Sequence, residues 1–161
     1  RFGSMRVLVD YAHNPEGLEG FLGIANYGRT GLLGLLLGQA GNRDDADVRA
    51  LADVAAKFRP DRIVLKDIDG FMRGRQSGEV AGILHAQLLL AGVAADRIDS
   101  VLDETTAATS LIAWARAGDV IALPVHATRA RAAVIALLDR LEQSNWQPGA
   151  PLPTVFSVDE R

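Results

Sequence analysis

Short apolar runs alternate with amphipathic stretches along the chain. One such run, Leu32–Leu37, lies between glycines, as expected for a strand buried on both faces. The expected strands, in chain order, are Val7–Val9, Leu32–Leu37, Arg62–Lys66, Ile98–Leu102 and Val120–Leu123. A proline-rich tail follows, and its segment Thr154–Val158 is a candidate edge strand.

The stretches between these runs repeat their apolar residues at helical spacing. Asn14 is a candidate N-cap followed by proline, and Asp44 or Asp45 can cap the next helix. Thr128 is expected to cap the last helix, whose predicted buried face is Val134, Ile135, Leu138 and Leu141. Strands alternating with such helices predict an α/β fold, with a mostly parallel Rossmann-like sheet of about six strands and helices on both faces.

Length and composition limit what such a chain can do. Its 161 residues suit one domain, which we place at residues 1–143, with residues 144–161 as a proline-rich tail. A net charge of −3 argues against binding nucleic acid through a broad basic surface. The absence of cysteine excludes disulfides, thiolate zinc sites and cysteine nucleophiles. No apolar run reaches the roughly 18–20 residues of a membrane span, so a cytoplasmic protein without membrane contact is expected.

Ligands of parallel α/β sheets bind beyond the carboxyl ends of the strands, so the loops there hold the candidate residues. In the first loop Asp10 can accept ribose hydroxyls, and His13 can meet a phosphate or a neighbouring domain. Asn14 can pair with a base edge or cap the helix, whose N-terminus favours anions. The alternative is a simple capping turn with a solvated aspartate.

The loop Gly38–Asp45 follows the second expected strand. Its glycines permit close approach of another backbone, and Arg43 can reach a nucleotide or an acidic substrate group. The alternative is a flexible turn that ends in a helix cap.

The loop Lys66–Glu79 is the longest polar segment. Its arginines, Arg73 and Arg75, can hold a carboxylate through two parallel hydrogen bonds, and Glu79 can meet a cationic group. The alternative is a mobile surface loop with solvated charges. After the fifth expected strand, His126 is a candidate ligand contact, with a structural role as the alternative.

Several familiar sites are excluded by their patterns. The glycines of Gly28–Gly34 lack the Gly-Lys-Ser/Thr ending of a P-loop, and no G-x-S-x-G elbow is present. The three histidines lack the spacing of a zinc site, so no metal site is expected in these residues.

Four segments occur in the order found in one ligase family. Asp10–Pro15 resembles the D-Y-A-H-N-P signature that opens the C-terminal domain of Mur ligases, folylpolyglutamate synthetases and cyanophycin synthetases. Gly41–Asp45 resembles G-D-R-x-D, and Arg73–Glu79 resembles the R-G-R-x-x-G-E segment typical of cyanophycin synthetases. A helix after Asp103-Glu104 that leads into Ala117–Ile121 matches the later pattern. The chain is therefore similar to the C-terminal, glutamate-ligase-type domain of the Mur ligase family, closest to the cyanophycin synthetase branch.

This resemblance implies an ATP-dependent amide ligase that adds an amino acid to a carboxylate through an acyl phosphate. The C-terminal domain would close over a central domain that carries the P-loop and the magnesium ion. Asp10, Asn14 and Arg43 would contact the nucleotide. His13, the candidate catalytic residue, would lie near the phosphates. The incoming amino acid would be bound by Arg73, Arg75 and Glu79.

The chain also departs from the family pattern. Asn42 replaces the usual aspartate, and Leu123–His126 stands where many Mur ligases have a G-K-G-H-E type segment. Since no P-loop occurs in these residues, the chain alone is expected to bind nucleotide weakly and to be inactive. The alternative is a stand-alone, non-catalytic module that binds a nucleotide or a partner. Arginine, aspartate and glutamate all remain candidate amino acids.

Overall fold

Five parallel strands form one sheet in the computed structural model, which describes residues 1–154. In the order β1-β5-β2-β3-β4, they are β1 (Arg6–Asp10), β5 (Val120–Pro124), β2 (Leu33–Leu37), β3 (Arg62–Leu65) and β4 (Ile98–Ser100). The predicted parallel α/β sheet is confirmed, with five strands in the described residues instead of about six. The sixth was expected over Thr154–Val158, of which all but the first residue lie outside the described part.

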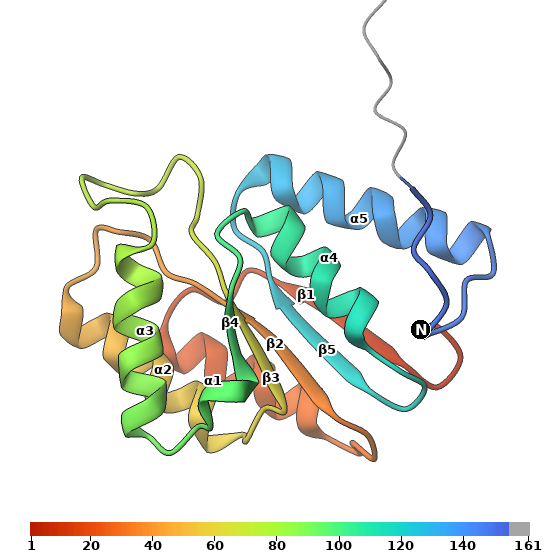
Figure 1. Cartoon of the computed structure of the whole chain (residues 1–161), viewed down its shortest axis with the longest axis horizontal. Helices are drawn as coiled ribbons and strands as arrows, with labels where there is room; N and C mark the ends of the chain where they lie inside the picture. The colour runs from red at the N-terminus through yellow and green to blue at the C-terminus, as the bar shows by residue number, and fades with distance from the viewer. Residues whose placement is uncertain (155–161) are drawn as a thin grey trace, which may run out of the picture.

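Helices cover both faces of this sheet (Figure 1). One face carries α1 (Pro15–Asn26), α2 (Asp45–Lys57) and α3 (Glu79–Leu90), and the other carries α4 (Glu104–Trp114) and α5 (Thr128–Gln143). A short 3-10 helix, Ala95–Arg97, leads into β4. Successive strand residues point to opposite faces, so Leu35 packs in the first core and Leu36 in the second. This double burial explains the continuous apolar runs.

The first two predicted helix caps are present. Asn14 Oδ1 accepts the backbone N–H of Gly17 at 2.7 Å, and Asp44 Oδ1, not that of Asp45, accepts the N–H of Asp47 at 2.8 Å. The third expectation was wrong. Ala127 holds the N-cap position of α5, and Thr128 is its first helical residue.

The predicted buried face of α5 needs one correction. Val134, Leu137 and Leu141 are buried and form the stripe that packs on the sheet, whereas Ile135 is 45% exposed. Ile135 follows Val134 by one residue, a turn of about 100° around the helix, which carries it out of the stripe. Leu138 is half-buried at the edge of the same core.

The chain after α5 folds back onto the N-terminus. Trp146 is buried and packs edge-on against Phe2, with 5.8 Å between ring centroids. Its indole N–H lies 3.1 Å from the carbonyl oxygen of Ala150. In residues 1–154 no helix combines the length and apolar character needed to cross a membrane.

Candidate functional site

Four loops meet where the strands of the sheet end. They follow β1, β2, β3 and β5 and span residues 10–14, 38–45, 66–79 and 124–128. Since β5 is inserted between β1 and β2, and the chain leaves β1 and β5 toward opposite faces, a crevice opens at this edge. Two pockets occupy it, and both are lined by residues of segment 67–73.

The smaller pocket, about 220 Å³ in volume, is basic. His13, Arg43 and Arg73 reach it from three different loops, so the structure brings together three residues that the sequence predicted. The described residues that line it include no carboxylate. Its other lining residues are Tyr11, Gln39, Ala40, Asn42, Ile68, Phe71 and His126.

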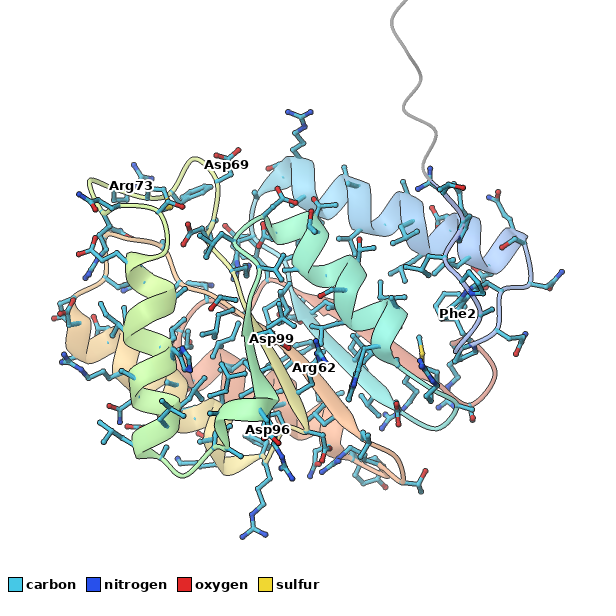
Figure 2. The ribbon with its side chains drawn as sticks, in the orientation of Figure 1. Phe2, Arg62, Asp69, Arg73, Asp96 and Asp99 are labelled. Carbon is cyan, nitrogen blue, oxygen red and sulfur yellow. The ribbon has the colours of Figure 1, made fainter. Side chains whose placement is uncertain are left out.

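The larger pocket, about 780 Å³ in volume, is acidic. It lies between the β3–α3 loop and the N-termini of α4 and α5, and one arginine, Arg129, also lines it. Those carboxylates belong to Asp67, Asp69, Asp103 and Glu104. Figure 2 shows Asp69 on the flank of the loop nearer α5 and Arg73 on the other flank. Within residues 1–154, no three His, Asp or Glu side chains are grouped so that they could hold a metal ion.

Asp67 is the most unusual of these carboxylates. Its side chain is largely buried, and Oδ2 accepts hydrogen bonds from Ser77 Oγ at 2.9 Å and from the N–H of Gly78 at 3.0 Å. Oδ1 is also buried, but it has no hydrogen-bond partner among the described residues. An unpartnered buried carboxylate oxygen is costly, and Asp67 brings its negative charge to the lining of the acidic pocket.

The alternation of side chains along one segment separates the two pockets. Asp67, Asp69 and Met72 line the acidic pocket, whereas Ile68, Phe71 and Arg73 line the basic one. Arg73 adopts a left-handed backbone conformation (φ 52°), and its guanidinium lies 5.4 Å from the centroid of the Phe71 ring. The strand exit therefore forms a thin wall between regions of opposite charge.

Lys66, Glu104 and His126 form a buried cluster that borders both pockets, because Glu104 lines the acidic pocket and His126 the basic one. The Lys66 ammonium is fully buried, donates to Glu104 Oε2 and lies 2.8 Å from His126 Nδ1. The Glu104 carboxylate also accepts the backbone N–H of His126 at 2.9 Å and of Ala127 at 3.0 Å. These two N–H groups belong to the residues just before Thr128, and α5 itself begins without a side-chain cap.

Burial and pairing shift the titration of this cluster. Burial lowers the pKa of the Lys66 ammonium from 10.5 to about 8, against the opposing charge of Glu104. Burial acts to raise the pKa of Glu104, but its contacts with His126 and the charge of Lys66 outweigh burial and hold that pKa at about 2. Glu104 is therefore ionised at neutral pH.

Two predicted nucleotide contacts, Asp10 and Asn14, lie outside the lining of both pockets. Asp10 is exposed at the end of β1, where its Oδ1 accepts the N–H of Tyr11 at 2.7 Å. Asn14 uses its side-chain oxygen to cap α1. Both remain beside His13 on the loop that borders the basic pocket.

Arg75 faces inward and joins the second loop to the third. Its Nε donates to the carbonyl oxygen of Gly41 at 3.0 Å, and Nη2 donates to the carbonyl of Arg43 and to Asp45 Oδ1. Gly41 also lets the backbone of the third loop come close, because a Cβ at this position would lie 1.8 Å from the carbonyl oxygen of Met72. Glu79 begins α3, and its Oε1 lies 3.7 Å from Arg75 Nη1. Neither Arg75 nor Glu79 lines a pocket.

Sequence reasoning missed the pair of Lys66 and Glu104. Glu104 follows the N-cap Asp103, where an acidic residue is ordinary because it complements the helix dipole. Lys66 directly follows the buried residues of β3 in a chain whose other basic residues, apart from Lys57, are arginines. A lysine at the end of a buried strand, in a chain that otherwise mostly uses arginine, was the available signal that Lys66 has a specific role.

Comparisons with known proteins give one family. The family model described as "Mur ligase, glutamate ligase domain" matches residues 1–123. The chain is 36% identical over 139 residues to cyanophycin synthetase from Crocosphaera subtropica, covering 86% of this chain and 15% of that protein. It is 30% identical over 115 residues to the UDP-N-acetylmuramoyl-L-alanyl-D-glutamate–2,6-diaminopimelate ligase of Bacillus cereus, covering 71% of this chain and 22% of that protein.

A solved structure of a ligase with that same enzyme name has a similar fold. The TM-score is 0.63 at 19% sequence identity, with 84% of this chain and 30% of the other covered. The chain thus spans a small part of the length of these relatives.

Proposed function

The chain belongs to the Mur ligase family as a glutamate ligase (C-terminal) domain, and from that premise we propose that it closes over the nucleotide of an ATP-dependent amide ligase. In the proposed reaction ATP phosphorylates a substrate carboxylate and leaves as ADP. The amino group of the incoming amino acid then attacks the acyl carbon, loses a proton and displaces phosphate. A central P-loop domain would hold the magnesium ion and most of the triphosphate.

One observation carries this proposal: a basic and an acidic pocket share a wall at the carboxyl edge of the sheet. The reaction needs an anionic acyl phosphate beside an amine, and adjacent pockets of opposite charge can orient both. Fixed charges aimed at the reacting groups stabilise developing charge without reorganising during the reaction.

The basic pocket would receive phosphate groups. His13, Arg43 and Arg73 line it, and arginine forks match the geometry of phosphate oxygens. Its volume of about 220 Å³ is below the roughly 300–1,000 Å³ of a complete ligand site. It would therefore take only part of a nucleotide, as a domain that supplies one wall of a shared site should. Asp10 and Asn14 would reach the rest of the nucleotide from the same loop.

The acidic pocket would hold the incoming amino acid. The negative charge of Asp67 would attract an ammonium group, and Arg129 with the nearby N-termini of α4 and α5 is suited to a carboxylate. Both groups belong to every amino acid. The surplus of carboxylates, with Asp69 exposed at the rim, favours a cationic side chain over aspartate or glutamate.

The assay follows from this division of roles. The chain is expressed with the in-frame sequence that precedes Arg1, and ADP release is measured with each amino acid and a carboxylate acceptor. A basic amino acid should stimulate ADP release, and Arg43→Ala should reduce it by roughly 10- to 100-fold, the effect of losing a charged hydrogen bond. Arg97→Ala is the control, since Arg97 is exposed at the opposite edge of the sheet.

Two results would contradict the proposal. One is a coding sequence that starts at Arg1 with no P-loop domain, together with nucleotide-independent partner binding. The other is ADP release that no amino acid alters. Either result would favour the non-catalytic binding module.

A further inference from the structure

The buried cluster of Lys66, Glu104 and His126 is connected to the loop that bears His13. His126 Nε2 lies 2.8 Å from the carbonyl oxygen of Ala12, the residue before His13. The Lys66 ammonium lies at the other ring nitrogen, Nδ1. His126 is thus the contact through which an ion pair between β3 and α4 reaches the β1–α1 loop.

The partners of the ring determine its protonation. A carbonyl oxygen can only accept a hydrogen bond, so Nε2 must carry the proton that it donates to Ala12. An ammonium group can only donate, so Nδ1 must present its lone pair to Lys66. Glu104 fixes the ammonium and also binds the backbone N–H of His126. One tautomer in one orientation satisfies all of these contacts.

Three consecutive backbone carbonyls of the β1–α1 loop each have a hydrogen-bonding side chain nearby. His13 Nδ1 lies 3.2 Å from the Tyr11 carbonyl, His126 bonds that of Ala12, and Gln39 Nε2 donates to that of His13 at 3.0 Å. The rings of Tyr11 and His126 are also in contact, with centroids 5.3 Å apart. Removing His126 would release the central one of three consecutive carbonyls.

We propose that Lys66 and Glu104 are positioning residues that act through His126 to hold the loop Tyr11–Asn14, and with it His13, at the basic pocket. The placement of the loop is a property of this chain alone. Only its consequence for catalysis rests on the proposed function.

Energetics favour a role in placement over one in stability. Two charges transferred from water into the interior gain little net stability over apolar residues of the same size. The fold nevertheless makes room for the pair: a Cβ at Gly38 would lie 2.7 Å from the Lys66 carbonyl oxygen and 2.9 Å from its Cε. The buried ion pair instead links three loops and fixes the orientation of the His126 imidazole.

The first test reads the ring of His126 directly in the wild-type chain. Two-bond ¹H–¹⁵N spectra of the histidine-labelled chain at pH 7.5 distinguish the tautomers, with His13 and His85 as the other two signals. We expect a single His126 tautomer protonated at Nε2. A ring protonated at Nδ1, or a mixture of tautomers, would overturn the proposal without any variant.

The second test follows the loop in two variants. His126→Phe keeps an aromatic ring but removes both nitrogens, and Lys66→Met/Glu104→Gln removes both buried charges together, which avoids leaving one unpaired. Both should shift the backbone amide signals of Tyr11–Asn14. Lys57→Met changes the only other lysine, which is exposed, and is the matched control. Amides of Tyr11–Asn14 that move no more than in Lys57→Met would refute the positioning role.

The third test uses the ligase with the sequence that precedes Arg1. His126→Phe should lower kcat by roughly 10- to 100-fold, the effect of misplacing a reacting group by about 1 Å. KM for the amino acid should stay unchanged, because His126 does not line the acidic pocket. Adding His126→Phe to the double variant should lower kcat little further, since both act on one loop.

Failures of the two proposals give different results. A wild-type ligase without amino-acid-dependent ADP release, combined with the expected tautomer and loop shifts, contradicts the proposed function and leaves the positioning role standing. An active ligase in which His126→Phe raises only KM for the amino acid, or leaves kcat unchanged, contradicts the positioning role.

Discussion

The two pockets lie side by side at one sheet edge, yet their charges are opposite. Arg43, Arg73 and His13 line the smaller pocket, whereas Asp67 and Asp69 line the larger one. The contrast arises at short range, because the turns within residues 67–73 direct Asp67 and Asp69 to one pocket and Arg73 to the other. A single strand exit can therefore separate a basic region from an acidic region without an additional element.

The buried cluster of Lys66, Glu104 and His126, which borders both pockets, is the least conventional part of the core. Lys66 and Glu104 are charged residues whose side chains are nevertheless buried. Their removal one at a time should have the largest effect of any change considered below, and it should damage both pockets at once.

Glu104→Ala should produce the largest loss of stability. It leaves the Lys66 ammonium buried without its partner. It also leaves the backbone N–H groups of His126 and Ala127 without their acceptor. Breaking one side of a buried pair costs about 3–5 kcal/mol of unfolding free energy, which urea denaturation monitored by circular dichroism would measure. Glu142→Ala, on the exposed end of α5, is the control and should change stability by less than about 0.5 kcal/mol. A loss below about 1 kcal/mol would show that the wall is not held by this pair.

The same carboxylate should make stability depend on pH in acid. Its pKa is about 2 in the folded chain and 4.5 as the ordinary value. Between these values the unfolded chain binds more protons, so unfolding free energy falls as pH falls. The contribution, about 3 kcal/mol, is complete above pH 4.5 and is lost as pH falls toward 2. Urea denaturation from pH 7 to 2 should show this slope in the wild type and a smaller one in Glu104→Gln.

Lys66 provides the check at the alkaline end. Its folded pKa of about 8 lies below the ordinary 10.5, so between these values the folded chain has already released a proton that the unfolded chain retains. The free energy of unfolding of the wild type, minus that of Lys66→Met, should therefore rise with pH over this range. A relative stability that falls instead would mean that Lys66 keeps its proton through attraction to Glu104.

Asp67→Asn should weaken the acidic pocket while the basic one is preserved. The amide oxygen can still accept from Ser77 and Gly78, so the loop keeps its shape, but the charge at the unpartnered oxygen is lost. Losing a charged hydrogen bond of about 1.5–3 kcal/mol should raise KM for the amino acid by roughly 10- to 100-fold. KM for ATP and the unfolding midpoint should change little, as they should in the control Asp96→Asn.

The fold was largely predictable because its signals are local. Buried parallel strands produce continuous apolar runs, and caps such as Asn14 and Asp44 act on residues three positions away. His13, Arg43 and Arg73 could be predicted to lie at one edge of the sheet because each follows a strand of one parallel sheet. Thr128 was misjudged because the helix begins one residue earlier than expected, with Ala127 at the N-cap, where Glu104 from another helix accepts the backbone N–H.

The buried cluster was not predictable in the same way. Lys66 and Glu104 are 38 positions apart in the chain, and each has an ordinary local explanation. Only the three-dimensional meeting of the ends of β3 and β5 with the start of α4 shows that they are partners. The N-termini of α4 and α5 likewise become walls of a pocket only when the β3–α3 loop lies across them.

Arg75→Lys should have the smallest effect, and it decides between two roles for that arginine. In the structure its fork holds the carbonyls of Gly41 and Arg43, whereas the family resemblance predicts contact with the amino acid. A lysine keeps the charge but cannot make the fork, so if Arg75 joins the loops, about 1 kcal/mol should be lost. This loss of stability should be accompanied by a higher KM for ATP. It should also be accompanied by faster hydrogen exchange at the Gly41 amide, which donates to the carbonyl oxygen of Phe71. If Arg75 instead binds the amino acid, exchange at Gly41 stays slow and only KM for the amino acid rises. The first outcome would place Arg75 on the basic side of the wall, as a residue that shapes the pocket of Arg43 and Arg73 without touching the ligand.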